Sequence, residues 1–181
     1  MHVTLDGFVA GPNGEMNWIH VDEEIFEYPG KLTANADTAL YGRVTYQMMD
    51  SYWPTAADEP GASKHDIEHG TWYNGVEKVV LSNTLQGKNI NNVKIVNGDV
   101  AGQIKELKQQ NGKDILIIGS PSTVHTLLEH DLIDDFWLFV NPVLLGQGIP
   151  LFKNVNAVTK LKLVANITFT SGVICTHYVK A

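Results

Sequence analysis

One stretch limits the fold of this chain more than any other: an apolar run that leads into a glycine turn and then a helical pattern. The run from Ile115 to Ile118 predicts a buried strand, and a helix is expected from Ser122 to His130. Between them, Gly119 and its neighbours predict a tight turn that opens onto the helix start. A helix start offers unpaired backbone N–H groups and the positive end of the helix dipole, so this turn suits a phosphate group.

A second strand with a glycine turn follows directly. The strand is expected from Asp135 to Leu145, and Gly146 and Gly148 come after it. Two glycine turns at strand ends of an α/β sheet favour a nucleotide cofactor site at that edge.

Strand and helix signals also alternate along the rest of the chain. Strands are expected at 1–10, 38–41, 78–83, 93–97, 161–167 and 173–179, and helices at 22–36, 43–51 and 99–111. The first helix is expected to break at Pro29, and residues 54–75 form either a long loop or a helix flanked by loops. The last two strands predict an antiparallel hairpin, so the fold class is α/β with a mixed sheet.

Composition excludes several classes of function. The 181 residues, 44% of them hydrophobic, fit a single domain over residues 1–181. The net charge is −7 and Arg43 is the only arginine, which argues against a nucleic-acid partner. No apolar run approaches the roughly 20 residues of a membrane span. The lone Cys175 fits a reducing compartment, and no signal peptide is evident, so a cytoplasmic location is expected.

Two further segments offer groups to a phosphate-bearing ligand. Gly42 follows a strand and opens a helix, so Arg43 and Thr45 are placed to supply a charge and a hydroxyl, unless this is an ordinary strand-to-helix turn. Leu81 and Ser82 end another strand, where Ser82 either contacts a ribose or its phosphate or only makes a turn.

The candidate substrate side lies near the start of the chain. Asp6 precedes Gly7 at a strand end, where its carboxylate either orients a substrate or caps a turn. Trp18 either walls a pocket or belongs to the core. Seven histidines are present, but no metal-binding spacing such as H-E-x-x-H or C-x-x-C occurs, so no metal site is predicted.

Taken together, these segments resemble a known family. TLDGFVAGPNGEMNWI, LYGRVTY, VVLSNT, the stretch from Ile115 to Phe152 and the closing hairpin occur in the order typical of the dihydrofolate-reductase-like fold. They are similar in particular to the C-terminal reductase domain of the bacterial riboflavin deaminase-reductase family. The zinc deaminase half of that family, with its H-x-E and P-C-x-x-C ligands, is absent from the chain. The resemblance implies a three-layer, mixed and mostly parallel sheet flanked by helices.

The resemblance also implies a cofactor and an activity. It implies NADPH, which would carry the reductive chemistry, and a small heterocyclic substrate: 5-amino-6-(5-phosphoribosylamino)uracil, as in riboflavin biosynthesis, or a dihydrofolate-like compound. The substrate would enter beside Asp6, Gly7 and Trp18. The cofactor-binding residues that it implies, together with the second glycine pair, are Gly42, Arg43, Thr45, Leu81, Ser82, Gly119, Ser120, Pro121, Ser122, Thr123, Gly146 and Gly148. Ser120 stands where the family's turn has a second glycine.

With this resemblance, three functions remain open. The first is an NADPH-dependent reductase, the second a nucleotide-binding protein without turnover, and the third a different enzyme on the same scaffold, such as one that uses a flavin. A homodimer is compatible with the closing hairpin, which is expected to leave an exposed sheet edge.

Overall fold

The computed structural model describes residues 1–85, 92–153, 155 and 157–181. It divides into two compact units, one formed by residues 22–120 and the other by residues 1–21 and 121–181. Each unit has its own sheet and its own packing. That the two units make up one domain stays a prediction.

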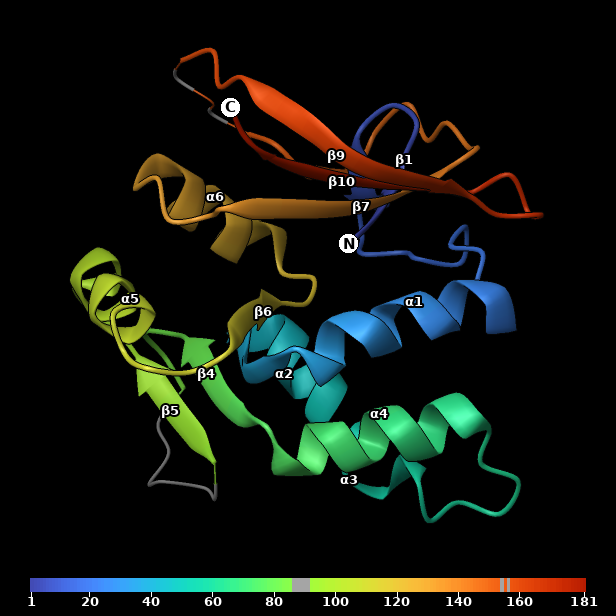
Figure 1. Cartoon of the computed structure of the whole chain (residues 1–181), viewed down its shortest axis with the longest axis horizontal. Helices are drawn as coiled ribbons and strands as arrows, with labels where there is room; N and C mark the ends of the chain where they lie inside the picture. The colour runs from blue at the N-terminus through green and yellow to red at the C-terminus, as the bar shows by residue number, and fades with distance from the viewer. Residues whose placement is uncertain (86–91, 154, 156) are drawn as a thin grey trace. The chain divides into compact units, whose positions relative to one another are not determined.

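A parallel sheet organises the unit of residues 22–120 (Figure 1). Its strand order is β5-β4-β3-β6, with β3 at Ala36–Gly42, β4 at Glu77–Leu81, β5 at Val93–Val96 and β6 at Asp114–Ile117. Each pairing in this sheet is parallel, and Gly42 lies opposite Leu81. The carboxyl ends of the four strands therefore share one edge of the sheet.

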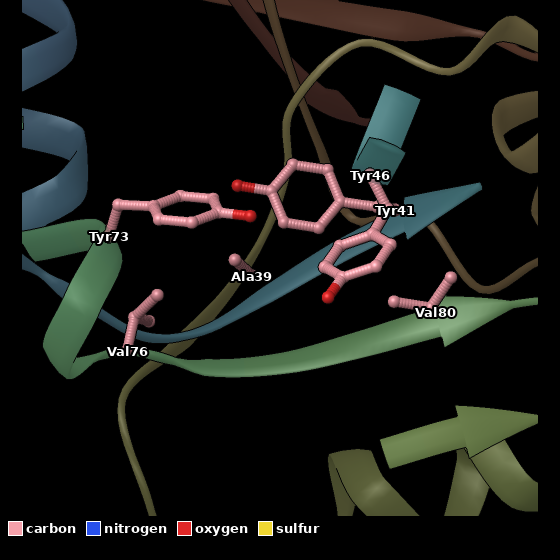
Figure 2. Packing of buried hydrophobic residues seen from close by; sticks show 6 residues of the cluster. All are labelled: Ala39, Tyr41, Tyr46, Tyr73, Val76 and Val80. Atoms are coloured by element: carbon pink, nitrogen blue, oxygen red, sulfur yellow. The ribbon is translucent and has the colours of Figure 1, made fainter. Parts of the chain in front are cut away.

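Helices connect these strands and pack against the sheet and one another. They are α1 (Glu23–Ala34), α2 (Arg43–Asp50), α3 (Trp53–Ala56), α4 (Lys64–Gly75) and α5 (Val100–Lys108). Figure 1 shows α1 and α4 side by side, and their residues are in contact. Three tyrosines, one each from β3, α2 and α4, gather in the core of this unit with Ala39, Val76 and Val80 (Figure 2). Burial of these large rings removes apolar surface from water and thereby stabilises this unit.

The other unit combines parallel and antiparallel pairings. Its four-stranded sheet has the order β1-β7-β10-β9, formed by His2–Thr4, Asp135–Asn141, Ile174–Lys180 and Leu161–Thr168. The pair β1–β7 is parallel, whereas β10 is antiparallel to both of its neighbours. β2 (Phe8–Ala10) pairs with β8 (Ile149–Pro150), and α6 spans Pro121–Glu129. The predicted class, α/β with parallel strands, flanking helices and a closing antiparallel hairpin, is confirmed.

Several local predictions need correction. The single strand expected at 1–10 is two strands, because Gly7 takes a φ of +89° and turns the chain between them. The strand expected to reach Leu145 ends at Asn141, before Pro142, and the short strand β8 was not predicted. The run Ile115 to Ile118 is half-buried rather than buried.

The expected break at Pro29 does not occur, since α1 runs through it from Glu23 to Ala34. Pro29 has no backbone N–H and so cannot make the helical hydrogen bond at its position. Packing compensates for this loss: Ile25 is fully buried, and Phe26 stacks on His65 of α4 with ring centroids 3.9 Å apart. Of the two alternatives for residues 54–75, the helical one holds, with α4 preceded by the short helix α3.

Candidate functional site

The carboxyl edge of the parallel sheet brings together three of the predicted cofactor segments. β3 ends at Gly42, β4 ends at Leu81, and β6 leads through Ile118 into Gly119 and Ser120. All of these residues belong to the unit of residues 22–120. The structure therefore places these segments, predicted separately from the sequence, at one edge.

The start of α2 lacks the side-chain cap that is found at the starts of α1, α4 and α5. Asp22, Ser63 and Asp99 cap α1, α4 and α5 through side-chain oxygens that accept from backbone N–H groups of the first turn. α2 begins after Gly42, which has no side chain to cap it, and its first turn has no acidic residue. The positive end of this helix is thus left for an anion from outside the helix.

The turn after β6 packs directly onto this helix start. Ser120 has a φ of +68°, unusual for a residue with a side chain, and it is 5% exposed. Its Oγ accepts a hydrogen bond from the backbone N–H of Gly42 at 3.0 Å. A Cβ on Gly119 would lie 3.3 Å from Thr45 Cγ2, so glycine allows the close approach of turn and helix. The hydrogen bond fixes the Gly119 turn against the start of α2, and glycine lets the turn come close to Thr45.

Arg43 is the charged group at this edge. It is exposed, and its guanidinium donates to Oε1 of Gln47, one helical turn further on, at 2.9 Å. A guanidinium has five N–H donors, so this bond leaves donors for a phosphate. Ser82 has a local role as well, because its Oγ accepts from the backbone N–H groups of Thr84 and Leu85 at 3.2 and 2.8 Å.

The last three residues of the predicted turn open α6 and differ in exposure. Pro121 is half-buried at the first helical position, Ser122 is exposed, and Thr123 is 2% exposed. Pro121 suits that position because its missing N–H has no partner in the first turn of a helix. Ser122 is therefore the one of the three whose side chain faces solvent.

Asp6 binds the second glycine loop. Its carboxylate accepts from Thr4 Oγ1 at 2.6 Å, from the Gly146 N–H at 2.7 Å and from the Leu145 N–H at 3.1 Å. These bonds, with that of Thr4 first, lower the pKa of Asp6 below its ordinary value, so the exposed carboxylate stays ionised. Of the two roles considered for Asp6, the turn-capping role is visible in the structure.

Gly148 and Trp18, which belong to the unit of residues 1–21 and 121–181, also have clear local contacts. Gly148 packs against β2 so closely that an added Cβ would overlap the carbonyl oxygen of Ala10. Trp18 is half-buried, and its indole N–H donates to the carbonyl of Glu15 at 3.2 Å. Cofactor or substrate contacts of Gly146, Gly148, Asp6 and Trp18 stay predictions.

Sequence reasoning missed Asn141, the last residue of β7. Asn141 is fully buried, its Nδ2 donates to the Phe139 carbonyl at 3.0 Å, and its Oδ1 accepts from the His20 N–H at 3.2 Å. It thereby holds the segment that follows Trp18 against the strand end. The one available signal was an amide side chain directly before Pro142 at the end of an apolar strand.

Among the described residues, no group of three or more His, Cys, Asp or Glu side chains is arranged to hold a metal ion. None of the helices in the described part of the chain is both long and apolar enough to cross a bilayer.

Comparison with known proteins identifies a family and a related protein of Bacillus subtilis. The family model described as "RibD C-terminal domain" matches residues 1–175. "Uncharacterized protein YyaP" of Bacillus subtilis (strain 168) is 35% identical over 176 residues, which cover 95% of this chain and 88% of the relative.

Two solved structures share the fold. A putative riboflavin biosynthesis protein from Shewanella sp. PV-4 superposes with a TM-score of 0.74 at 24% identity, over 100% of this chain and 96% of that one. Dihydrofolate reductase from Enterococcus faecalis, complexed with NADP(H) and RAB-propyl, has a TM-score of 0.64 at 14% identity, over 99% and 92% of the two chains. At these identities the likeness establishes the fold alone.

Proposed function

Since this chain belongs to the RibD C-terminal domain family, we propose that it is an NADPH-dependent reductase of a small heterocyclic substrate. The observation that carries the proposal is the start of α2, which no side chain of its own caps and onto which the Gly119 turn is fixed. This arrangement presents backbone N–H groups and one guanidinium at the edge of a parallel sheet, as a pyrophosphate requires.

The residues at this edge fit the cofactor that the family implies. Arg43 and the first-turn N–H groups of α2 would hold the pyrophosphate, with the Thr45 hydroxyl beside them. Gly119 fits because its φ of +65° favours glycine and a Cβ there would lie only 3.3 Å from Thr45 Cγ2. The Ser82 hydroxyl, at the end of the neighbouring strand, would face the adenosine 2′-phosphate. NADPH, when bound, supplies a hydride, and the chain's residues orient the two reactants and exclude water.

Titration of the protein with NADPH, followed by nicotinamide fluorescence, tests the cofactor site, with NADH as the comparison. Saturable binding that prefers NADPH is the expected result. Binding of neither nucleotide would refute the reductase proposal. Binding without oxidation against a panel of heterocycles would instead indicate the non-catalytic nucleotide-binding protein.

Arg43→Ala tests the assigned phosphate contact. Loss of a charge-assisted hydrogen bond is expected to weaken NADPH binding by roughly 1.5–3 kcal/mol. Lys94→Ala is the matched control, because it removes the same charge from an exposed position within β5 rather than at the strand end. Equal affinity of the Arg43 variant and the wild type would contradict the contact.

We also propose that the protein acts as a cytoplasmic homodimer. β9 is the outer strand of its sheet, and Leu161, Leu163 and Val164 on it are 38%, 46% and 53% exposed. An apolar outer strand of this kind offers unpaired backbone groups to a second strand. Light scattering on the purified protein tests the assembly: a dimer mass is expected, and a monomer at all concentrations would refute it.

A further inference from the structure

Two histidines lie one helical turn apart on α4, a helix that contributes no residue to the predicted cofactor site. His65 and His69 are four positions apart, so their side chains lie on the same face of α4. Their ring centroids are 5.4 Å apart. Two imidazoles that bind one metal ion through nitrogens at about 2.0–2.1 Å have ring centroids roughly 5 Å apart. The separation of the two rings therefore matches that of two ligands on one ion.

Aromatic side chains from α1, α3 and α4 pack around the two imidazole rings. Phe26 stacks on His65 with ring centroids 3.9 Å apart. The Trp53 ring contacts both histidines, at 5.5 Å from His65 and 4.2 Å from His69. Trp72 lies 5.2 Å from His69. These contacts restrict the rotation of both imidazoles, which reduces the entropy that they lose when they bind a ligand.

Nε2 of His69 is a buried polar atom for which the described part of the chain offers no hydrogen-bond partner. A buried polar atom without a partner destabilises a fold, and a ligand bound to that atom removes this cost. Burial lowers the pKa of His69 from 6.5 to about 4 and also lowers the pKa of His65. Both imidazoles are therefore neutral at pH 7, which is the form that binds metal ions.

The charges near His65 favour a cation. Burial is the main cause of the lowered pKa of His65, and the carboxylates of Asp66 and Glu68 oppose it through their negative charge. The Asp66 carboxylate accepts from the Ser63 hydroxyl at 2.7 Å, which lowers the pKa of Asp66 and keeps it ionised. Glu68 pairs with Lys64 at 3.8 Å. Since no third His, Cys, Asp or Glu completes a ligand group within the described residues, an ion here would keep positions open to water.

We propose that His65 and His69 bind a divalent first-row transition metal ion through their ring nitrogens, with water at the remaining positions. Imidazole ligands favour Cu²⁺ over Zn²⁺ by the general affinity order of these ions, and they select against Mg²⁺ and Ca²⁺, which prefer oxygen ligands. The site lies within the unit of residues 22–120 and does not depend on the proposed reductase function. A bound ion would stabilise α4 and its packing, because it binds only the folded arrangement of the two rings.

Tryptophan fluorescence tests the site directly, because Trp53 and Trp72 contact the histidine rings and a bound Cu²⁺ ion quenches nearby indoles. The full chain, without a histidine tag, is titrated with Cu²⁺ at pH 7, and Mg²⁺ serves as the comparison. Saturable quenching by Cu²⁺ alone is expected. His65→Gln and His69→Gln should each weaken it at least about tenfold. His130→Gln, which removes an exposed histidine outside α4, should leave it unchanged.

Modification of histidines by diethyl pyrocarbonate, located by mass spectrometry, tests the wild-type protein without any variant. Cu²⁺ should slow the modification of His65 and leave that of His130 unchanged. Three results would each overturn the proposal: no saturable quenching below about 1 mM Cu²⁺, full quenching in either glutamine variant, or equal modification of His65 with and without the ion.

Discussion

Ser120 is expected to stabilise the carboxyl edge of the parallel sheet through its hydrogen bond with Gly42, although its backbone conformation is unfavourable. Its Oγ accepts from the Gly42 N–H at 3.0 Å in a buried position, and its φ is +68°. Ser120→Ala keeps the unfavourable conformation and leaves a buried donor without this acceptor, which costs about 1–3 kcal/mol of unfolding free energy. Ser120→Gly loses the same bond but relieves the conformation.

The two variants therefore separate the hydrogen bond from the backbone strain. A side chain in the left-handed region costs roughly 1–2 kcal/mol, and the extra freedom of glycine in the unfolded chain offsets roughly 0.5–1 kcal/mol of that relief. Ser120→Gly is thus expected to be destabilised by about 0.5–1 kcal/mol less than Ser120→Ala.

Urea unfolding followed by circular dichroism measures both differences. Ser122→Ala is the control, because Ser122 is exposed and its loss should change stability by no more than about 0.5 kcal/mol. The reasoning is refuted if Ser120→Ala is as stable as the wild type, or if Ser120→Gly is the less stable of the two.

Three further perturbations test other parts of the structure. Asp6→Asn should lower the unfolding temperature at neutral pH. The pKa of Asp6 is lower in the folded protein than its ordinary value of 3.8, so the ionised carboxylate stabilises the fold above that pH and loses this effect when it is protonated. The difference in unfolding temperature between the variant and the wild type should therefore shrink as the pH falls below about 3.8. Gly148→Ala should cost about 1–3 kcal/mol in urea unfolding because its Cβ overlaps the Ala10 carbonyl, whereas Gly30→Ala, in open space on α1, should be neutral or stabilising. Burial lowers the pKa of His69 from 6.5 to about 4, so its contribution to the free energy of unfolding should be complete above pH 6.5 and should decrease as the pH falls towards 4. His69→Leu should make the free energy of unfolding depend less on pH over this range, and an unchanged pH dependence in the variant would contradict the assignment to His69.

The features predicted best from the sequence are those specified by neighbouring residues. Gly42 and the helix after it were predicted correctly because a glycine breaks the strand and the apolar pattern changes period at that point. The helix expected at 99–111 is observed as α5, and Asp99 caps its start by accepting from the Gly102 N–H at 2.9 Å. In these cases the local chemistry and the fold agree.

The features that escaped prediction depend on partners far along the chain. β8 has only two residues, and its partner β2 lies about 140 positions earlier, so no local pattern marks it. The bond between Gly42 and Ser120 spans 78 positions, and that between Asp6 and Gly146 spans 140. The break expected at Pro29 failed for the same reason, because contacts of α1 with α4 outweigh a local preference.

The parallel pairing of β1 with β7 has a consequence for synthesis of the chain. His2–Thr4 pairs with β7, which spans Asp135–Asn141, so the first strand cannot form its native pairing until most of the chain has been synthesised. The unit of residues 22–120, by contrast, is continuous in sequence and has all of its strands available earlier. This order of emergence favours early folding of the unit of residues 22–120, while the segment that carries Asp6 and Trp18 reaches its native pairing only after β7 has been made.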